Sequence, residues 1–192
     1  SKTTTIGTSG NGKITNSTHG YRYQGNNPNN YIWFNDEMWR IIGYVPVCMT
    51  SGCASTENRV KIIRNSSIGS VVYKTNTTSD STWRVSTIQK LLNTCYLGKK
   101  SDTDTTCASY CYSAYATNAK PVAKCDYTNI GINESDYYGS MIESVYWNVG
   151  EPSSTSTVNA DDQYTKEIAS YTSSASKIGL MYASDWGYAI EG

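Results

Sequence analysis

Apolar residues in this chain form short clusters between long polar stretches, and the spacing within each cluster predicts its secondary structure. Residues 31–45 read YIWFNDEMWRIIGYV, which is two apolar runs on either side of Asn35 and Asp36. Asn and Asp tolerate a positive φ, so this pattern predicts a β-hairpin that turns at these two residues. The sequence VKIIR at residues 60–64 predicts a third strand.

Strict alternation along the second strand predicts which of its side chains share a face. One face carries Trp39, Ile41 and Gly43, and the other carries Met38, Arg40, Ile42 and Tyr44. Both faces are largely apolar, so we expect this strand to be central in its sheet. Arg40 is the exception and needs a partner or a route to solvent.

Three later segments have helical spacing. They span residues 83–93, residues 135–148 with Gly150 as a stop, and residues 160–170 with Asn159 as the N-terminal cap. Residues 177–182, KIGLMY, predict a last strand. The core predicted from these elements is Trp39, Ile41, Ile62, Ile88, Leu91, Met141, Ile142 and Val145.

The polar, glycine-containing segment 1–20 allows two interpretations, a flexible tail or an extended edge strand. Residues 21–192 are expected to form a single α+β domain. Its fold class is a small antiparallel sheet with two or three helices, stapled by disulfides.

The six cysteines change the picture most: Cys48, Cys53, Cys95, Cys107, Cys111 and Cys125. None forms a CxxC pair, so a disulfide framework in an oxidising compartment is the simplest interpretation. We predict sequential pairing, Cys48–Cys53, Cys95–Cys107 and Cys111–Cys125, because local turns bring these partners close. The first bridge would close a hairpin tip, and the others would staple the aperiodic stretch 95–132.

Composition narrows the classes of function. The 192 residues have 16 basic and 16 acidic side chains, so the basic excess of a nucleic-acid binder is missing. No run of 18 apolar residues exists, which excludes a membrane span in this chain. The chain has 17 tyrosines and 5 tryptophans but a single phenylalanine. Tyrosine and tryptophan suit surfaces that are partly in contact with water, as in secreted surface proteins.

Catalytic and metal-binding patterns are weak. His19 is the single histidine and lies in the polar segment, so no nucleophile and base pair is evident and we expect no enzyme. No cofactor or metal site is expected. One low-specificity alternative is a glycan-reading calcium loop of the C-type-lectin kind, built from Glu151 with Asp161 and Asp162.

Several motifs together resemble a known family. They are YRY at 21–23, NNPNNY at 26–31, WFN at 33–35, EMWRIIG at 37–43, KIIR at 61–64, SIG at 67–69, Trp83, LLN at 91–93, KIGLMY at 177–182 and SDWGYA at 184–189. They resemble an extracellular domain of gut-type Gram-positive bacteria that often follows a type IV prepilin helix. The resemblance implies a C-type-lectin-like fold and a pilin-like surface role, and it carries no catalytic residues. That prepilin helix is absent from this sequence, and the family usually continues past the last motif with more strands, so we expect either that the chain is a fragment or that another chain supplies the missing strands.

These observations predict an extracellular, non-catalytic subunit of a bacterial surface filament (a pilin or fimbrium). The alternative is a monomeric adhesin or lectin-like module that binds glycan or a host protein. For the filament, we expect self-association through strand donation. The segment around Thr3 to Thr15 would pair with the strand at 177–182 of a neighbouring subunit.

Overall fold

The computed structural model describes residues 14–17, 19–25, 27–75, 82–113, 123–147, 159–168 and 174–190. The chain divides into two compact units, and each is described by itself. The sheet unit comprises residues 1–66, 148–171 and 180–192, and the loop unit comprises residues 67–147 and 172–179. The prediction of one domain over residues 21–192 stays a prediction.

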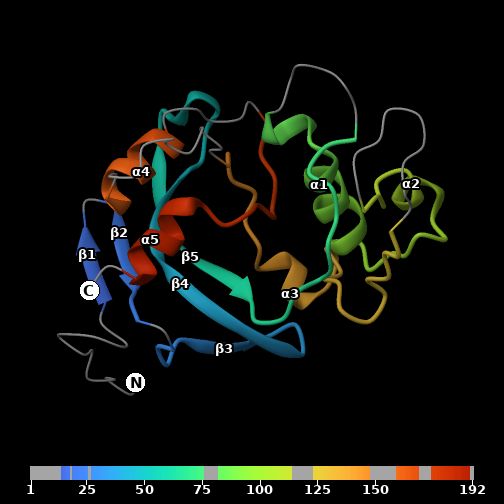
Figure 1. Cartoon of the computed structure of the whole chain (residues 1–192), viewed down its shortest axis with the longest axis horizontal. Coiled ribbons are helices and arrows are strands. Elements are labelled where there is room, and N and C mark those ends of the chain that lie inside the picture. Colours follow the sequence, from blue (N-terminus) through green and yellow to red (C-terminus); the bar gives the residue numbers. More distant parts are fainter. Residues whose placement is uncertain are drawn as a thin grey trace. The chain divides into compact units, whose positions relative to one another are not determined.

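An antiparallel sheet forms the sheet unit (Figure 1). Its described strands are β1 (Ile14–Ser17), β2 (Gly20–Tyr23), β3 (Tyr31–Phe34), β4 (Glu37–Cys48) and β5 (Thr56–Arg64). The long strand β4 pairs with β2, β3 and β5, which confirms its predicted central place. The predicted hairpin is also confirmed, because Asn35 and Asp36 turn with φ of 53° and 58°.

A β-bulge at Ile42 overturns the predicted faces of β4. Ile41 pairs with Ile62 and Gly43 pairs with the adjacent Lys61, so Ile42 is an extra residue without a partner on β5. Because the side-chain period is two, one extra residue exchanges the faces beyond it. Gly43 therefore shares a face with Arg40, and Tyr44 lies on the face of Ile41.

Two helices lie against one face of this sheet, α4 (Ala160–Glu167) and α5 (Ala183–Ile190) (Figure 1). Helix α4 confirms the predicted third helix. The side chain of Asn159 caps it by accepting the backbone N–H of Asp162 at 2.9 Å. Helix α5 was not predicted from the sequence.

The strand predicted at 177–182 is wrong. Asn93 satisfies the backbone of Ile178 instead of a neighbouring strand, accepting its N–H at 3.0 Å and donating to its carbonyl at 2.9 Å. Gly179 lies under the Trp147 ring, where any Cβ would overlap the indole. These contacts belong to the loop unit and hold the segment in an irregular path.

Short helices make up the loop unit. They are η2 (Trp83–Val85), α1 (Thr87–Lys90), the π-helical η3 (Leu91–Tyr96), α2 (Thr105–Ala108) and α3 (Tyr137–Ser140). The helix predicted at 83–93 is confirmed from Thr87 onward and continues to Tyr96, whereas η2 is a separate turn because Ser86 is extended. The helix predicted at 135–148 is wrong after Ser140, because Val145 forms a β-bridge with Ser176 through hydrogen bonds of 3.0 and 3.1 Å.

All three disulfides form with the predicted connectivity: Cys48–Cys53, Cys95–Cys107 and Cys111–Cys125. The first closes the turn from β4 to β5 through η1 (Ser51–Cys53), as expected for a hairpin tip. The other two staple the loop unit. The chain therefore has the predicted disulfide-stapled α+β fold.

The predicted core is partly correct. Trp39, Leu91 and Val145 are buried, and Ile41, Ile62, Ile88 and Ile142 are half-buried. Met141 is 58% exposed, because α3 ends before it and the expected apolar helix face does not exist.

Strand β1 bears out the edge-strand interpretation for residues 14–17, since it pairs with β2 of the same chain. Residues 1–13 lie outside the described part of the chain. The expected strand donation is wrong in its acceptor, because residues 177–182 form no strand. Within the described residues, no helix has the length and apolarity to cross a membrane.

Candidate functional site

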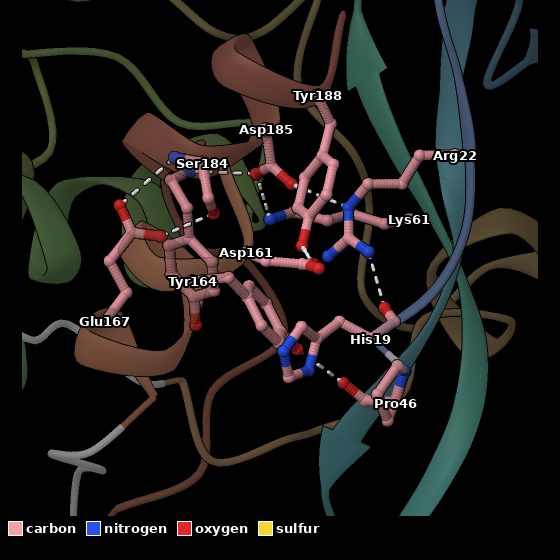
Figure 2. A network of polar contacts seen from close by, with 11 residues as sticks. His19, Arg22, Pro46, Lys61, Asp161, Tyr164, Glu167, Ser184, Asp185 and Tyr188 are labelled. Carbon is pink, nitrogen blue, oxygen red and sulfur yellow. Dashed lines mark hydrogen bonds and ion pairs between the residues drawn. The ribbon is translucent and has the colours of Figure 1, made fainter. Parts of the chain in front are cut away.

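Three strands of the sheet unit place two cations side by side. Arg22 on β2 and Lys61 on β5 both pair with Gly43 on β4, so the three residues form one row across the sheet. Asp185, in the first turn of α5, lies over this row and binds both cations (Figure 2). Asp185 Oδ2 contacts Lys61 Nζ, and Asp185 Oδ1 lies 3.8 Å from Arg22 Nε.

Gly43 makes this convergence possible. A Cβ at residue 43 would overlap the carbonyl oxygen of Tyr21 and crowd the side chain of Arg22. The glycine leaves the middle of the row empty, and the two long side chains flank that space under Asp185. The bulge at Ile42 is equally necessary, since it directs residue 43 to this face.

Aromatic rings enclose the two cations. The Arg22 guanidinium lies 4.3 Å from the ring centre of Tyr188 and 4.8 Å from that of Tyr164. Lys61 Nζ lies 4.1 Å from the Tyr182 ring. Cation–π attraction is stronger away from water, so these rings partly offset the cost of burying the charges.

Burial shifts the pKa of two groups in this cluster. Desolvation lowers the pKa of Lys61, and the attraction of Asp185 opposes that shift without cancelling it. Burial raises the pKa of the Tyr164 phenol, with Arg22 opposing the change. The cluster is thus a buried ion network in which Asp185 favours the charged form of Lys61.

A second carboxylate supports the start of α5. Glu167, buried at the end of α4, accepts the backbone N–H of Ser184 at 3.2 Å and its hydroxyl (Figure 2). Asp185 accepts the backbone N–H of Tyr182 at 2.9 Å, which is the bond that the third helical residue makes in a capping box. These bonds fix α5 over the sheet and set the position of Asp185.

A pocket of about 270 Å³ adjoins the ion network. It lies between α5, the residues after β2 and the sheet face of Arg40, and we call it the α5 pocket. Within the part of the chain that the structure describes, four of its lining residues have a buried side-chain polar atom with no hydrogen-bond partner, although the large majority of such atoms are normally paired. They are Arg22 Nε, Asn30 Oδ1, Arg40 Nε and Asp185 Oδ1.

Arg40, the charged residue on an otherwise apolar strand, has the partners that we expected it to need. Its guanidinium lies 4.4 Å from the ring centre of Tyr31 and donates to the Tyr31 hydroxyl and to Asn27 Oδ1. Neither partner is a carboxylate. In the described chain, Arg40 therefore retains an unneutralised positive charge at the pocket.

Exposed apolar side chains extend from the pocket. Tyr31 pairs with Arg40 across the sheet, and Trp33 pairs with Met38, so all of them face the same side as the pocket. Trp186 of α5 also lines the pocket and is 62% exposed. We call Tyr31, Trp33, Met38 and Trp186 the aromatic ledge. Exposed apolar groups gathered in one patch are typical of interaction sites.

Of the residues considered from the sequence, His19 and Asp161 border the ion network, and neither lines the α5 pocket. His19 packs its ring 4.6 Å from that of Tyr164, and its carbonyl accepts a bond from Arg22. Asp161 accepts the Tyr188 hydroxyl, Asp162 is exposed on α4, and Glu151 lies outside the described residues. No three metal-ligating side chains converge within the ranges that the structure describes.

Sequence reasoning missed the ion network and the pocket. Arg22 and Asp185 both lie within the motifs that carry the family resemblance, YRY and SDWGYA, and this was their only signal. Arg40 was noted because a charge on an apolar strand is unusual. No known protein family matches the chain, and neither curated proteins nor solved structures include a match.

Proposed function

We propose that this chain is a non-catalytic binding module of a bacterial cell surface, and that its ligand enters the α5 pocket. The observation that carries the proposal is the set of unpaired buried polar atoms around the pocket. Leaving a buried donor or acceptor unpaired costs about 1–3 kcal/mol, and a ligand with complementary groups would recover that cost. The three disulfides fit a secreted protein.

The charged groups beside the pocket support binding rather than catalysis. Asp185 is held by Lys61, and Glu167 is occupied by both polar groups of Ser184. A general base must be able to reach the proton that it removes, and both oxygens of Glu167 already accept bonds from Ser184.

A filament subunit is the second candidate, and a different surface favours it. Tyr21, Tyr44 and Val60 form a cross-strand row on the sheet face opposite Arg22 and Lys61, and all three are exposed. An exposed row of this kind suits contact with another copy of the chain. Strand donation is not needed for that contact.

One pair of variants separates the two candidates. Wild type, Trp186→Ala and Tyr44→Ala are compared for binding to an array of neutral and charged glycans, and for oligomeric state by light scattering. A binding module predicts that Trp186→Ala loses glycan binding while Tyr44→Ala keeps it. If wild type binds no glycan and forms oligomers that Tyr44→Ala abolishes, the filament replaces the binding module.

A further inference from the structure

We propose that the α5 pocket binds an acidic saccharide, with the sugar carboxylate against Arg40, its hydroxyls on Asn30 and Asp185, and its ring on Trp186. This inference rests on the proposed binding function and names its ligand class. Four independent features of the pocket carry it: charge, unpaired acceptors, an exposed indole and size.

The charge around the pocket selects an anion. Arg22 and Lys61 share Asp185, and Arg64 donates to Glu37 at 2.7 and 2.8 Å. Among the described residues, the guanidinium of Arg40 donates to an amide oxygen and a phenol, and its Nε–H has no partner there. A guanidinium binds a carboxylate, as it does a phosphate, through charge-assisted hydrogen bonds of defined geometry.

A simple anion would leave half of the pocket unsatisfied. Asn30 Oδ1 and Asp185 Oδ1 are acceptors without donors, so the ligand must also donate hydrogen bonds. Asn30 is held in place by its own amide group, which donates to the Ile41 carbonyl. Its free oxygen therefore stays directed away from that bond.

The gap between Arg22 and Asp185 suits a hydroxyl in particular. Arg22 Nε and Asp185 Oδ1 lie 3.8 Å apart, which is too long for a direct hydrogen bond. Both atoms are sealed from solvent, so their side chains must shift slightly to admit a ligand, and a hydroxyl can then accept from Arg22 and donate to Asp185 at the same time. Sugar hydroxyls offer this paired capacity on a rigid ring.

Trp186 supplies the apolar contact. It is 62% exposed and lines the pocket beside Met181 and Ile41. The C–H face of a pyranose ring is flat and apolar, so it can cover an indole that water otherwise contacts.

The size of the site indicates one enclosed sugar within a longer chain. A volume of about 270 Å³ lies just below the range of roughly 300–1,000 Å³ that is usual for drug-sized ligands. It therefore holds one sugar residue, and the aromatic ledge beyond it provides contact for neighbouring residues.

Isothermal titration calorimetry tests the proposal with four probes on the full chain. They are an oligogalacturonide, a sialyl-lactose, the oligogalacturonide with its carboxylates reduced to alcohols, and tetraglutamate. The first two distinguish uronic from sialic acids as the source of the acidic sugar. The variants are Arg40→Gln and Trp186→Ala, with Tyr44→Ala on the opposite face as the control.

We expect at least one acidic sugar to bind, with affinity reduced about tenfold or more by carboxylate reduction, by Arg40→Gln and by Trp186→Ala. The control should bind like wild type. Thermal melting tests whether Arg40→Gln folds, and the exposed Trp186 provides a second variant if it does not.

Two results overturn the acidic-sugar inference and keep the binding module: equal binding of the reduced saccharide, or binding of tetraglutamate without either acidic sugar. The absence of binding by all four probes also overturns the inference. The proposed binding function is also overturned only if the protein binds no glycan on the wider array.

Discussion

The sheet unit and the loop unit stabilise their interiors by different means. In the sheet unit the backbone is paired along long strands, and the buried groups include the charged side chains of Arg22, Glu167 and Asp185. In the loop unit the described helices are three to six residues long, and the interior holds Leu91, Tyr127 and two disulfides.

The difference follows from how each backbone is organised. A regular sheet satisfies its own polar groups and presents rows of side chains, so it can carry a buried ion network on one face. An irregular segment loses more entropy on folding for each contact that it gains. Cross-links then help by restricting the unfolded chain. Charge and aromatic rings hold the first unit, and covalent bonds hold the second.

The sharpest test of the ion network is removal of its carboxylate. Asp185→Ala leaves Lys61 and Arg22 without their shared partner, and removing one member of a buried ion pair typically costs about 3–5 kcal/mol. Urea unfolding gives the change in the free energy of unfolding. The exposed Glu143→Ala is the control and should change it by less than about 0.5 kcal/mol. Similar losses in both variants would mean that the network does not stabilise the sheet unit.

Disulfide removal tests the other half of the comparison. The Cys95–Cys107 bridge spans 12 residues and is fully buried, whereas Cys48–Cys53 spans 5 residues at a hairpin tip. Loop-closure entropy predicts losses of about 3 and about 2 kcal/mol respectively, with an added cavity cost for the buried pair. Denaturant unfolding of the two double Cys→Ala variants measures both. A larger loss at the hairpin tip would contradict the assignment of the main staples to the loop unit.

The smallest expected effect concerns how stability depends on pH. The loop unit should set this dependence at acid pH and the sheet unit at alkaline pH. In the loop unit, the pKa of Asp104 lies below its ordinary 3.8 because the Cys107 N–H binds the carboxylate. The stability that Asp104 contributes is therefore present above pH 3.8 and lost as pH falls through the folded pKa. Asp126, bound by the Thr128 hydroxyl, acts in the same direction.

In the sheet unit, the stability should depend on pH in the alkaline range. The pKa of Lys61 is below its ordinary 10.5 because of burial, so the unfolded chain holds the proton longer and stability rises toward pH 10.5. Asp104→Asn should flatten the acid limb of stability against pH, and Lys61→Met should flatten the alkaline rise. The division fails if either variant changes the opposite limb.

Local sequence signals predicted the local features correctly. Asn35 and Asp36 are adjacent, the cysteine partners are 5 to 14 residues apart, and Asn159 caps the helix that follows it. Each of these features depends on neighbouring residues, so turn chemistry and spacing were sufficient.

The errors arose where distant residues decide the structure. Ile178 is held by Asn93, 85 residues away, and Lys61 binds Asp185 across 124 residues. The apolar pattern around Met141 fits a helix, yet Val145 forms a β-bridge with Ser176 instead of a further helical turn. The candidate site depends on such distant pairs, so only Arg40 could be noted from the sequence.

The extra residue at Ile42 exchanges the two faces of β4 beyond it. Upstream of it, odd-numbered residues face one side of the sheet, and downstream they face the other. Deleting Ile42 would leave Gly43 directly after Ile41 and still opposite Lys61, so both faces would keep their side chains. Deleting Gly43 instead would place the Ile42 side chain opposite Lys61, where a Cβ overlaps the carbonyl oxygen of Tyr21. A related chain without the bulge should therefore lack one residue at this position, and it should keep a glycine opposite the residue that corresponds to Lys61.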